Sequence, residues 1–275
     1  MHVSSVRDLS AVALLLLAVV LGALWAPTTW LHHHVVEREG FLAITEPLAE
    51  DPDFQRTMSD SAVEMLLGDE RIPGWIEESL TPLAEEQAAA LTGTGVYATL
   101  WNATMSELHG ALFSPGASDL DVDLAPVIDR ILTPVEEKLP IEIPRPEDAT
   151  ITLASIPDVP LLTRASAVTP WAQWTGPAAL VLLALALLIA SHRRALLIMA
   201  GLGGILAGAG VWWIGEQVEA VVPDSIDQAA FLGPVVQVFE GHFQAAMMPQ
   251  GVIMLGAGAL VTAAGLVLVG LHRRS

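Results

Sequence analysis

The chain has no cysteine, and it holds a single lysine, Lys138, and a single asparagine, Asn102. The absence of cysteine excludes disulfide bonds, thiolate ligands for zinc or iron–sulfur clusters, thiol nucleophiles and a lipid-modified N-terminal cysteine. Any part of the protein that lies in water must therefore be held together by packing rather than by disulfide bonds.

Charged residues are missing from four long apolar stretches. No Asp, Glu, Lys, Arg or His occurs in Leu9–Trp25, Trp171–Ala190, Ala195–Ile214 or Gly251–Leu271. A helix of roughly 20 residues spans the roughly 30 Å of hydrocarbon in a bilayer. The sequence therefore predicts four transmembrane helices.

The charges that remain are divided unevenly between the connecting segments. Five of the 12 basic residues, but only one of the 31 acids, Asp8, lie in three short segments: residues 1–8, 191–194 and 272–275. The other 30 acids lie in residues 27–170 and 215–250. Because basic residues resist translocation, we expect both termini and the 191–194 turn in the cytoplasm.

We predict a mainly α protein: a four-helix transmembrane bundle with a mostly helical extracytoplasmic domain that carries a small β element. The first helix is expected to be an uncleaved signal anchor, because its apolar run continues to Trp25 without a small-x-small cleavage site. The predicted segments are a cytoplasmic N-terminus (1–8), membrane helix 1 (9–26), the extracytoplasmic domain (27–170), membrane helix 2 (171–190), a cytoplasmic turn (191–194), membrane helix 3 (195–214), an extracytoplasmic acidic helical loop (215–250), membrane helix 4 (251–271) and a cytoplasmic C-terminus (272–275).

Local patterns place elements inside the two acidic segments. Asp51-Pro52 is typical of an N-cap followed by proline at the first helical position. An apolar stripe with spacings of three and four residues predicts a helix through Tyr97, Trp101, Met105, Leu108 and Leu112. Two alternating stretches, Asp119–Leu124 and Thr150–Ala154, predict a pair of strands. A helix break is expected near Gly233-Pro234.

Two groups of side chains are candidate metal ligands. His32, His33 and His34 follow the first apolar stretch and precede Glu37, and imidazole with carboxylate binds zinc or copper. The alternative is a solvated stalk next to the membrane. In the second group, Asp119, Asp121 and Asp123 would share one face of a strand and suit calcium. The alternative there is a half-buried strand with a solvated polar face.

Small residues recur in the third and fourth apolar stretches. Gly204 and Gly208 form a GxxxG step, and Gly258 and Thr262 have the same spacing. Small side chains let helices approach closely in lipid. These residues therefore predict helix packing within the bundle, or homo-oligomerisation through the same faces.

The sequence does not indicate an enzyme or a cofactor. It contains no HExxH, no GxSxG and no glycine-rich phosphate-binding loop. A formal charge of −19 argues against nucleic-acid binding. The apolar stretches hold no ionisable residue, which argues against an ion-coupled transporter acting alone.

Three motifs give the chain a resemblance: Asp121-Val-Asp-Leu-Ala-Pro-Val-Ile-Asp129, Ala149-Thr-Ile-Thr-Leu-Ala154 and Arg193-Arg-Ala-Leu-Leu197. In these motifs it resembles a family of multi-pass envelope membrane proteins of high-GC Gram-positive, actinobacterial bacteria. The likeness covers most of residues 27–170 and the following hairpin. Because that family has no assigned activity, the resemblance implies an architecture and an envelope location, and it transfers no functional residues.

The expected function is therefore non-enzymatic. We expect an integral protein of the plasma membrane whose outer domain interacts with a membrane or envelope protein partner, or acts as a scaffold. One alternative is an auxiliary subunit of a transport or export assembly. Another is an outer-face metal-binding protein or sensor that uses His32–His34.

Overall fold

The computed structural model describes residues 2–52, 54–56, 95–114, 118–123, 150–156, 166–167, 169–221 and 232–272. The chain forms two compact units. The first unit comprises Met1–Glu37, Arg164–Asp224 and Val238–Ser275, and the second comprises Arg38–Thr163 and Ser225–Gln237. Among the described residues the protein is mainly helical.

Four helices are long and apolar enough to cross a membrane: α1 (His2–Leu31), α8 (Ala172–Ile189), α9 (Arg193–Glu216) and α11 (Leu232–His272). All four belong to the first unit, except for the start of α11 before Val238. Short turns of other helix types accompany them: η1 (His32–Val36), η2 (Thr169–Trp171) and η3 (Glu219–Val221). Their length and composition identify a membrane protein.

Two of these helices are longer than a bilayer requires. At a rise of about 1.5 Å per residue, the 30 residues of α1 extend about 45 Å and the 41 residues of α11 about 60 Å. The predicted boundary at residue 26 is therefore not a helix end, and neither is the predicted boundary at residue 250. Gly233-Pro234 lies in the first turn of α11, where the missing N–H of proline costs no helical hydrogen bond.

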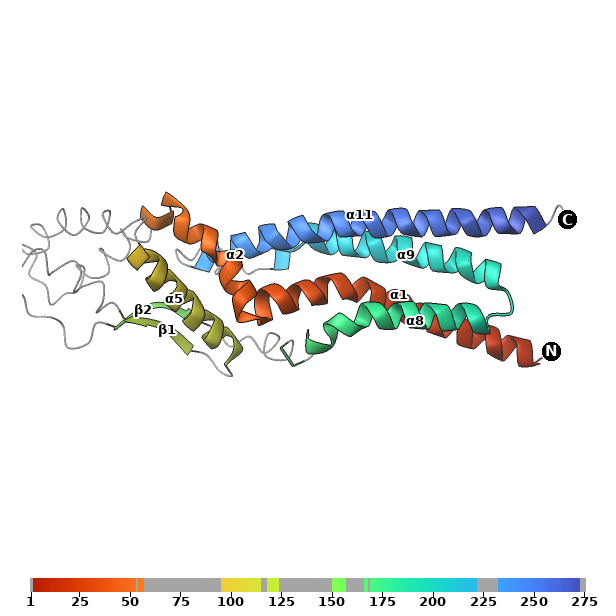
Figure 1. Cartoon of the computed structure of the whole chain (residues 1–275), viewed down its shortest axis with the longest axis horizontal. Helices are drawn as coiled ribbons and strands as arrows, with labels where there is room; N and C mark the ends of the chain where they lie inside the picture. Colours follow the sequence, from red (N-terminus) through yellow and green to blue (C-terminus); the bar gives the residue numbers. More distant parts are fainter. Residues whose placement is uncertain are drawn as a thin grey trace, which may run out of the picture. The chain divides into compact units, whose positions relative to one another are not determined.

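The helices of the first unit pair in an antiparallel sense. The N-terminal half of α1 packs on the C-terminal half of α8, where Ala11 and Leu15 form a buried cluster with Ala186 and Ala190. Figure 1 shows that α1 begins, α8 turns into α9, and α11 ends at the same end of this unit. The two chain ends and the α8–α9 turn therefore lie at one end of the four long helices.

A hydrogen-bond network joins the start of α1 to the turn between α8 and α9. The Arg7 guanidinium donates two hydrogen bonds, of 3.2 and 3.0 Å, to the carbonyl oxygen of Ile189. The Asp8 carboxylate accepts one from the backbone N–H of Ser191 at 2.9 Å and contacts the His192 ring at 3.2 Å. Asp8 thus links the first turns of α1 to the turn between α8 and α9.

The described core of the second unit lies between α2 (Arg38–Glu50) and α5 (Gly95–Phe113). Trp101 is buried, and its indole N–H donates to the carbonyl oxygen of Thr45 at 3.1 Å. The other buried apolar side chains of this core are Phe41, Ile44, Leu48, Phe54, Met105 and Leu108. The predicted apolar stripe of residues 97–112 therefore forms a helix whose Trp101, Met105 and Leu108 are in the core.

Two smaller features of the second unit follow from local sequence. The Asp51 carboxylate accepts a hydrogen bond from the Phe54 backbone N–H at 3.2 Å, which confirms the predicted N-cap. Strands β1 (Ser118–Asp123) and β2 (Thr150–Ile156) pair antiparallel, with a register shift between Leu120 and Asp121. These strands overlap the two alternating stretches of the sequence.

Candidate functional site

The candidate site is built on a local change of helix type. Directly after α1, residues His32–Val36 form one turn of π-helix, and the Glu37 backbone N–H donates to the carbonyl oxygen of His32 at 2.9 Å. In a regular α-helix, residues five apart point about 140° away from each other. The wider π-turn brings them to one side, and such turns are frequent at functional sites.

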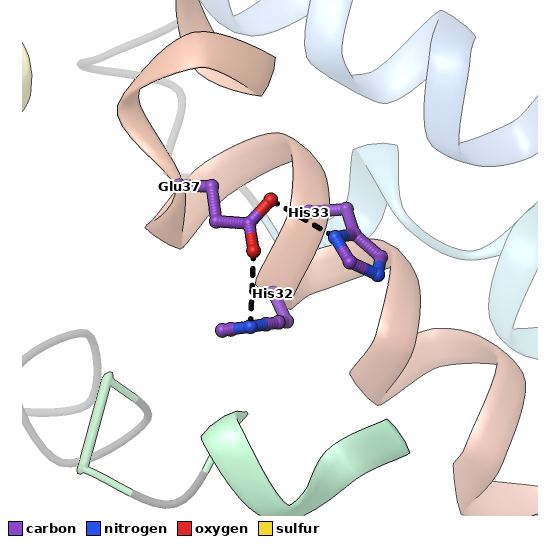
Figure 2. Close-up of side chains that lie close together, drawn as sticks. All are labelled: His32, His33 and Glu37. Atoms are coloured by element: carbon purple, nitrogen blue, oxygen red, sulfur yellow. Dashed lines mark hydrogen bonds and ion pairs between the residues drawn. The ribbon is translucent and has the colours of Figure 1, made fainter.

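This turn gathers two imidazoles around one carboxylate. Glu37 Oε1 lies 3.2 Å from His32 Nε2, and Glu37 Oε2 lies 2.9 Å from His33 Nδ1. Figure 2 shows the two carboxylate oxygens directed to the two rings, one oxygen to each. One ligand atom from each of these three residues lies within 4.8 Å of the others. The three side chains thus form one compact cluster.

The cluster is partly exposed and electrostatically coupled. The His32 side chain is 18% exposed, whereas those of His33 and Glu37 are 49% and 47% exposed. The hydrogen bond from His33, together with the charge of the neighbouring histidines, holds the pKa of Glu37 below its usual value. Partial desolvation opposes this shift and is outweighed. Glu37 is therefore a carboxylate at neutral pH.

His34 does not join the cluster. Its ring stacks on Trp30 with 5.1 Å between the ring centroids, and its Nδ1 lies 3.0 Å from the carbonyl oxygen of Trp30. Trp30 is itself buried and meets the ring of Phe243 edge-on at 4.9 Å. His34 thus belongs to an aromatic contact between α1 and α11. Among the described residues the compact group therefore consists of His32, His33 and Glu37, and His34, the third histidine of the predicted set, lies apart from it.

The aspartates of the second predicted group lie on one strand. Asp119, Asp121 and Asp123 all belong to β1, opposite Ser155, Thr152 and Thr150 of β2. Their side chains lie outside the described part of the structure. Calcium binding at this strand stays a prediction.

The predicted packing glycines meet along α9 and α11. A Cβ atom added to Gly204 would lie 3.2 Å from the Cα of Gly258, and one added to Gly208 would lie 2.5 Å from the backbone nitrogen of Leu255. The Thr262 hydroxyl donates to the carbonyl oxygen of Gly258 at 2.9 Å, so it is satisfied within its own helix. These residues account for close packing of α9 on α11 within one chain.

Thr29, which lies near the cluster, could not be identified as a candidate site residue from the sequence. Thr29 Oγ1 and His32 Nδ1 are both buried, and neither has a hydrogen-bond partner among the described residues. They are three residues apart and lie on the same side of the helix. Only the structure, by burying both atoms, could reveal this pair of unsatisfied polar groups.

Comparison of the chain with protein-family models, with curated proteins and with solved structures found no match.

Proposed function

We propose that this protein is a non-enzymatic integral membrane protein of the cell envelope whose second unit faces outward and interacts with a membrane or envelope protein. The resemblance to actinobacterial multi-pass envelope proteins agrees with this location.

The observation that supports the orientation most strongly is the position of the arginines. Arg7, Arg193 and Arg194 lie at the end of the first unit where α1 begins and α8 turns into α9 (Figure 1). Short connections rich in arginine remain on the cytoplasmic side. The chain that leaves the opposite end of α1, beginning at Arg38, would then emerge outside the membrane.

The tryptophans fit the same orientation. Trp25, Trp171, Trp174 and Trp213 are largely exposed at the ends of the spans that lie away from the arginines. An indole ring suits the boundary between lipid tails and headgroups. They therefore mark the level at which the helices would leave the hydrocarbon on the outer side.

The absence of cysteine provides a direct test of the orientation. Single cysteines can be placed at two exposed serines, Ser114→Cys at the end of α5 and Ser191→Cys in the α8–α9 turn. A membrane-impermeant maleimide should label Ser114→Cys in intact cells and Ser191→Cys only after the membrane is opened. The reverse pattern would overturn the proposal.

A second candidate function is favoured by the exposure of α11. Large apolar side chains of this helix point away from the rest of the first unit: Val252, Ile253, Leu260 and Val267. Lipid can cover such a face, and so can another membrane protein. An auxiliary subunit of a transport or export assembly would bind its partner through this face, whereas an envelope scaffold would bind through the second unit.

A further inference from the structure

We infer that His32, His33 and Glu37 bind a divalent transition-metal ion, for which Zn²⁺ is the appropriate probe. This site goes beyond the proposed envelope role and does not depend on the orientation of the chain. Two imidazole nitrogens with one carboxylate oxygen is a ligand set that zinc uses in proteins. The set leaves a coordination position for water or for another ligand.

The geometry of the cluster is close to what an ion requires. In a tetrahedral site with bonds of about 2.1 Å, ligand atoms lie about 3.4 Å apart. The two nitrogen–oxygen separations in the cluster are 3.2 and 2.9 Å, and the three ligand atoms all lie within 4.8 Å of one another. An ion could replace the His33–Glu37 hydrogen bond and the His32–Glu37 ion pair after side-chain movements, without a change in the backbone.

The backbone conformation already brings these residues together before any metal binds. A π-turn is a rare helix type, and here it places residue 37 beside residue 32. The chain could pass from α1 to α2 without a π-turn. The ligands are therefore positioned in advance, which reduces the ordering entropy that metal binding would otherwise cost.

The unsatisfied atoms behind the cluster supply a second, independent observation. A histidine that binds metal through Nε2 carries its proton on Nδ1, and that N–H usually donates to a neighbouring oxygen. His32 Nδ1 and Thr29 Oγ1 are both buried without a partner in the described part of the chain, one helical turn apart. When a metal occupies Nε2, His32 Nδ1 carries a proton, and Thr29 Oγ1, one helical turn earlier on the same side of the helix, is the acceptor that we assign to it.

Metal ions of other chemical classes do not suit this site. Mg²⁺ and Ca²⁺ prefer ligand sets made of oxygen and need more oxygen ligands than Glu37 alone supplies. The sequence has no cysteine for thiolate coordination. Imidazole with carboxylate suits zinc and its neighbours in the first transition row.

Zinc binding to the full-length protein in detergent micelles tests the inference. The protein is purified with a histidine-free affinity tag and titrated with Zn²⁺ in competition with a chromogenic chelator. We expect one Zn²⁺ per chain and no comparable binding of Mg²⁺. No zinc binding, or a zinc affinity no higher than that of single exposed histidines, would overturn the inference.

Variants of the cluster distinguish its ligands from their neighbours. His33→Gln keeps an N–H donor for Glu37 but loses the imidazole ligand, so its zinc affinity should fall by more than about 10-fold. Glu37→Gln should lower the affinity similarly. His34→Phe, which keeps an aromatic ring on Trp30, should leave the affinity unchanged. Equal losses in His34→Phe and His33→Gln would contradict the assignment.

The role of Thr29 has its own test. Thr29→Val removes the acceptor for the His32 Nδ1 proton and should weaken zinc binding by about 10-fold, whereas Thr29→Ser should retain it. Circular dichroism of each variant checks that the helices are intact. X-ray absorption at the zinc edge gives a second readout: we expect two imidazoles in the wild type and one in His33→Gln, and two in both would refute the site.

Discussion

A single added methyl group should separate α9 from α11 at one glycine and have no such effect two residues away. In Gly258→Ala, the new Cβ would lie 2.5 Å from the backbone nitrogen of Ile205 and 2.7 Å from the carbonyl oxygen of Gly201. Both neighbours are main-chain atoms, so a rotamer change cannot relieve the clash. The two helices must move apart and lose contact along the glycine surface.

The matched control is Gly256→Ala, because a Cβ at Gly256 meets no atom within 4 Å. Both variants gain the same helix propensity, about 1 kcal/mol or less, so this term cancels in the comparison. Overpacking a close contact costs about 1–3 kcal/mol. Gly258→Ala should therefore be less stable than Gly256→Ala by about 1–3 kcal/mol.

The assay is unfolding of the purified protein in mixed micelles of mild detergent and dodecyl sulfate, followed by helical circular dichroism. The free energy of unfolding is compared between Gly258→Ala and Gly256→Ala in the same experiment. Equal values for the two variants would refute the close approach of α9 and α11. A lower stability in Gly256→Ala would instead indicate that the exposed face of α11 is occupied in the purified protein.

Three other changes test separate contacts. Trp101→Phe removes the indole donor to the Thr45 carbonyl oxygen of α2 and should cost about 0.5–1.5 kcal/mol in the second unit, measured by hydrogen exchange, whereas Trp171→Phe, at a side chain 71% exposed, should have no effect. His33→Ala should raise the pKa of Glu37 toward its usual value in a ¹³C NMR titration. Because the pKa of Glu37 is lowered in the folded protein, the contribution of Glu37 to stability is present above its pKa in the unfolded chain. That contribution is lost as the pH falls through its pKa in the folded protein. A free energy of unfolding that does not change over this pH range would contradict the linkage. Asp8→Ala removes the acceptor that holds the α8–α9 turn and should accelerate tryptic cleavage there; an unchanged cleavage rate would show that the contact is unimportant.

The four long helices could be predicted from the sequence because their apolar runs match the thickness of a bilayer. The bounds of α8 and α9 lie within two residues of the predicted spans 171–190 and 195–214. The continuity of α11 could not be predicted in the same way. Glu240, His242 and Pro249 interrupt its apolar pattern, and an interior proline removes one helical hydrogen bond, so the pattern predicted a shorter helix than α11.

The sequence indicated the type of ligand at the candidate site, imidazole with carboxylate, but not which residues come together. Three adjacent histidines indicate metal-binding capacity, but the choice between them depends on one i→i+5 hydrogen bond. That bond brings Glu37 to His32 and His33, while the ring of Trp30 takes His34 out of the set. Helix type at a single turn depends on packing from outside the local sequence, so no periodicity reveals it.

Photo-crosslinking in native membranes tests the proposed envelope role most directly. A photoreactive residue is placed at Glu107, exposed on α5 of the second unit, and separately at Leu260, exposed on α11. We expect the probe at residue 107 to capture a specific membrane or envelope protein, identified by mass spectrometry, while the probe at residue 260 captures none. Capture of a stoichiometric membrane partner at residue 260 alone would contradict the outer-unit role and favour the subunit of a transport or export assembly.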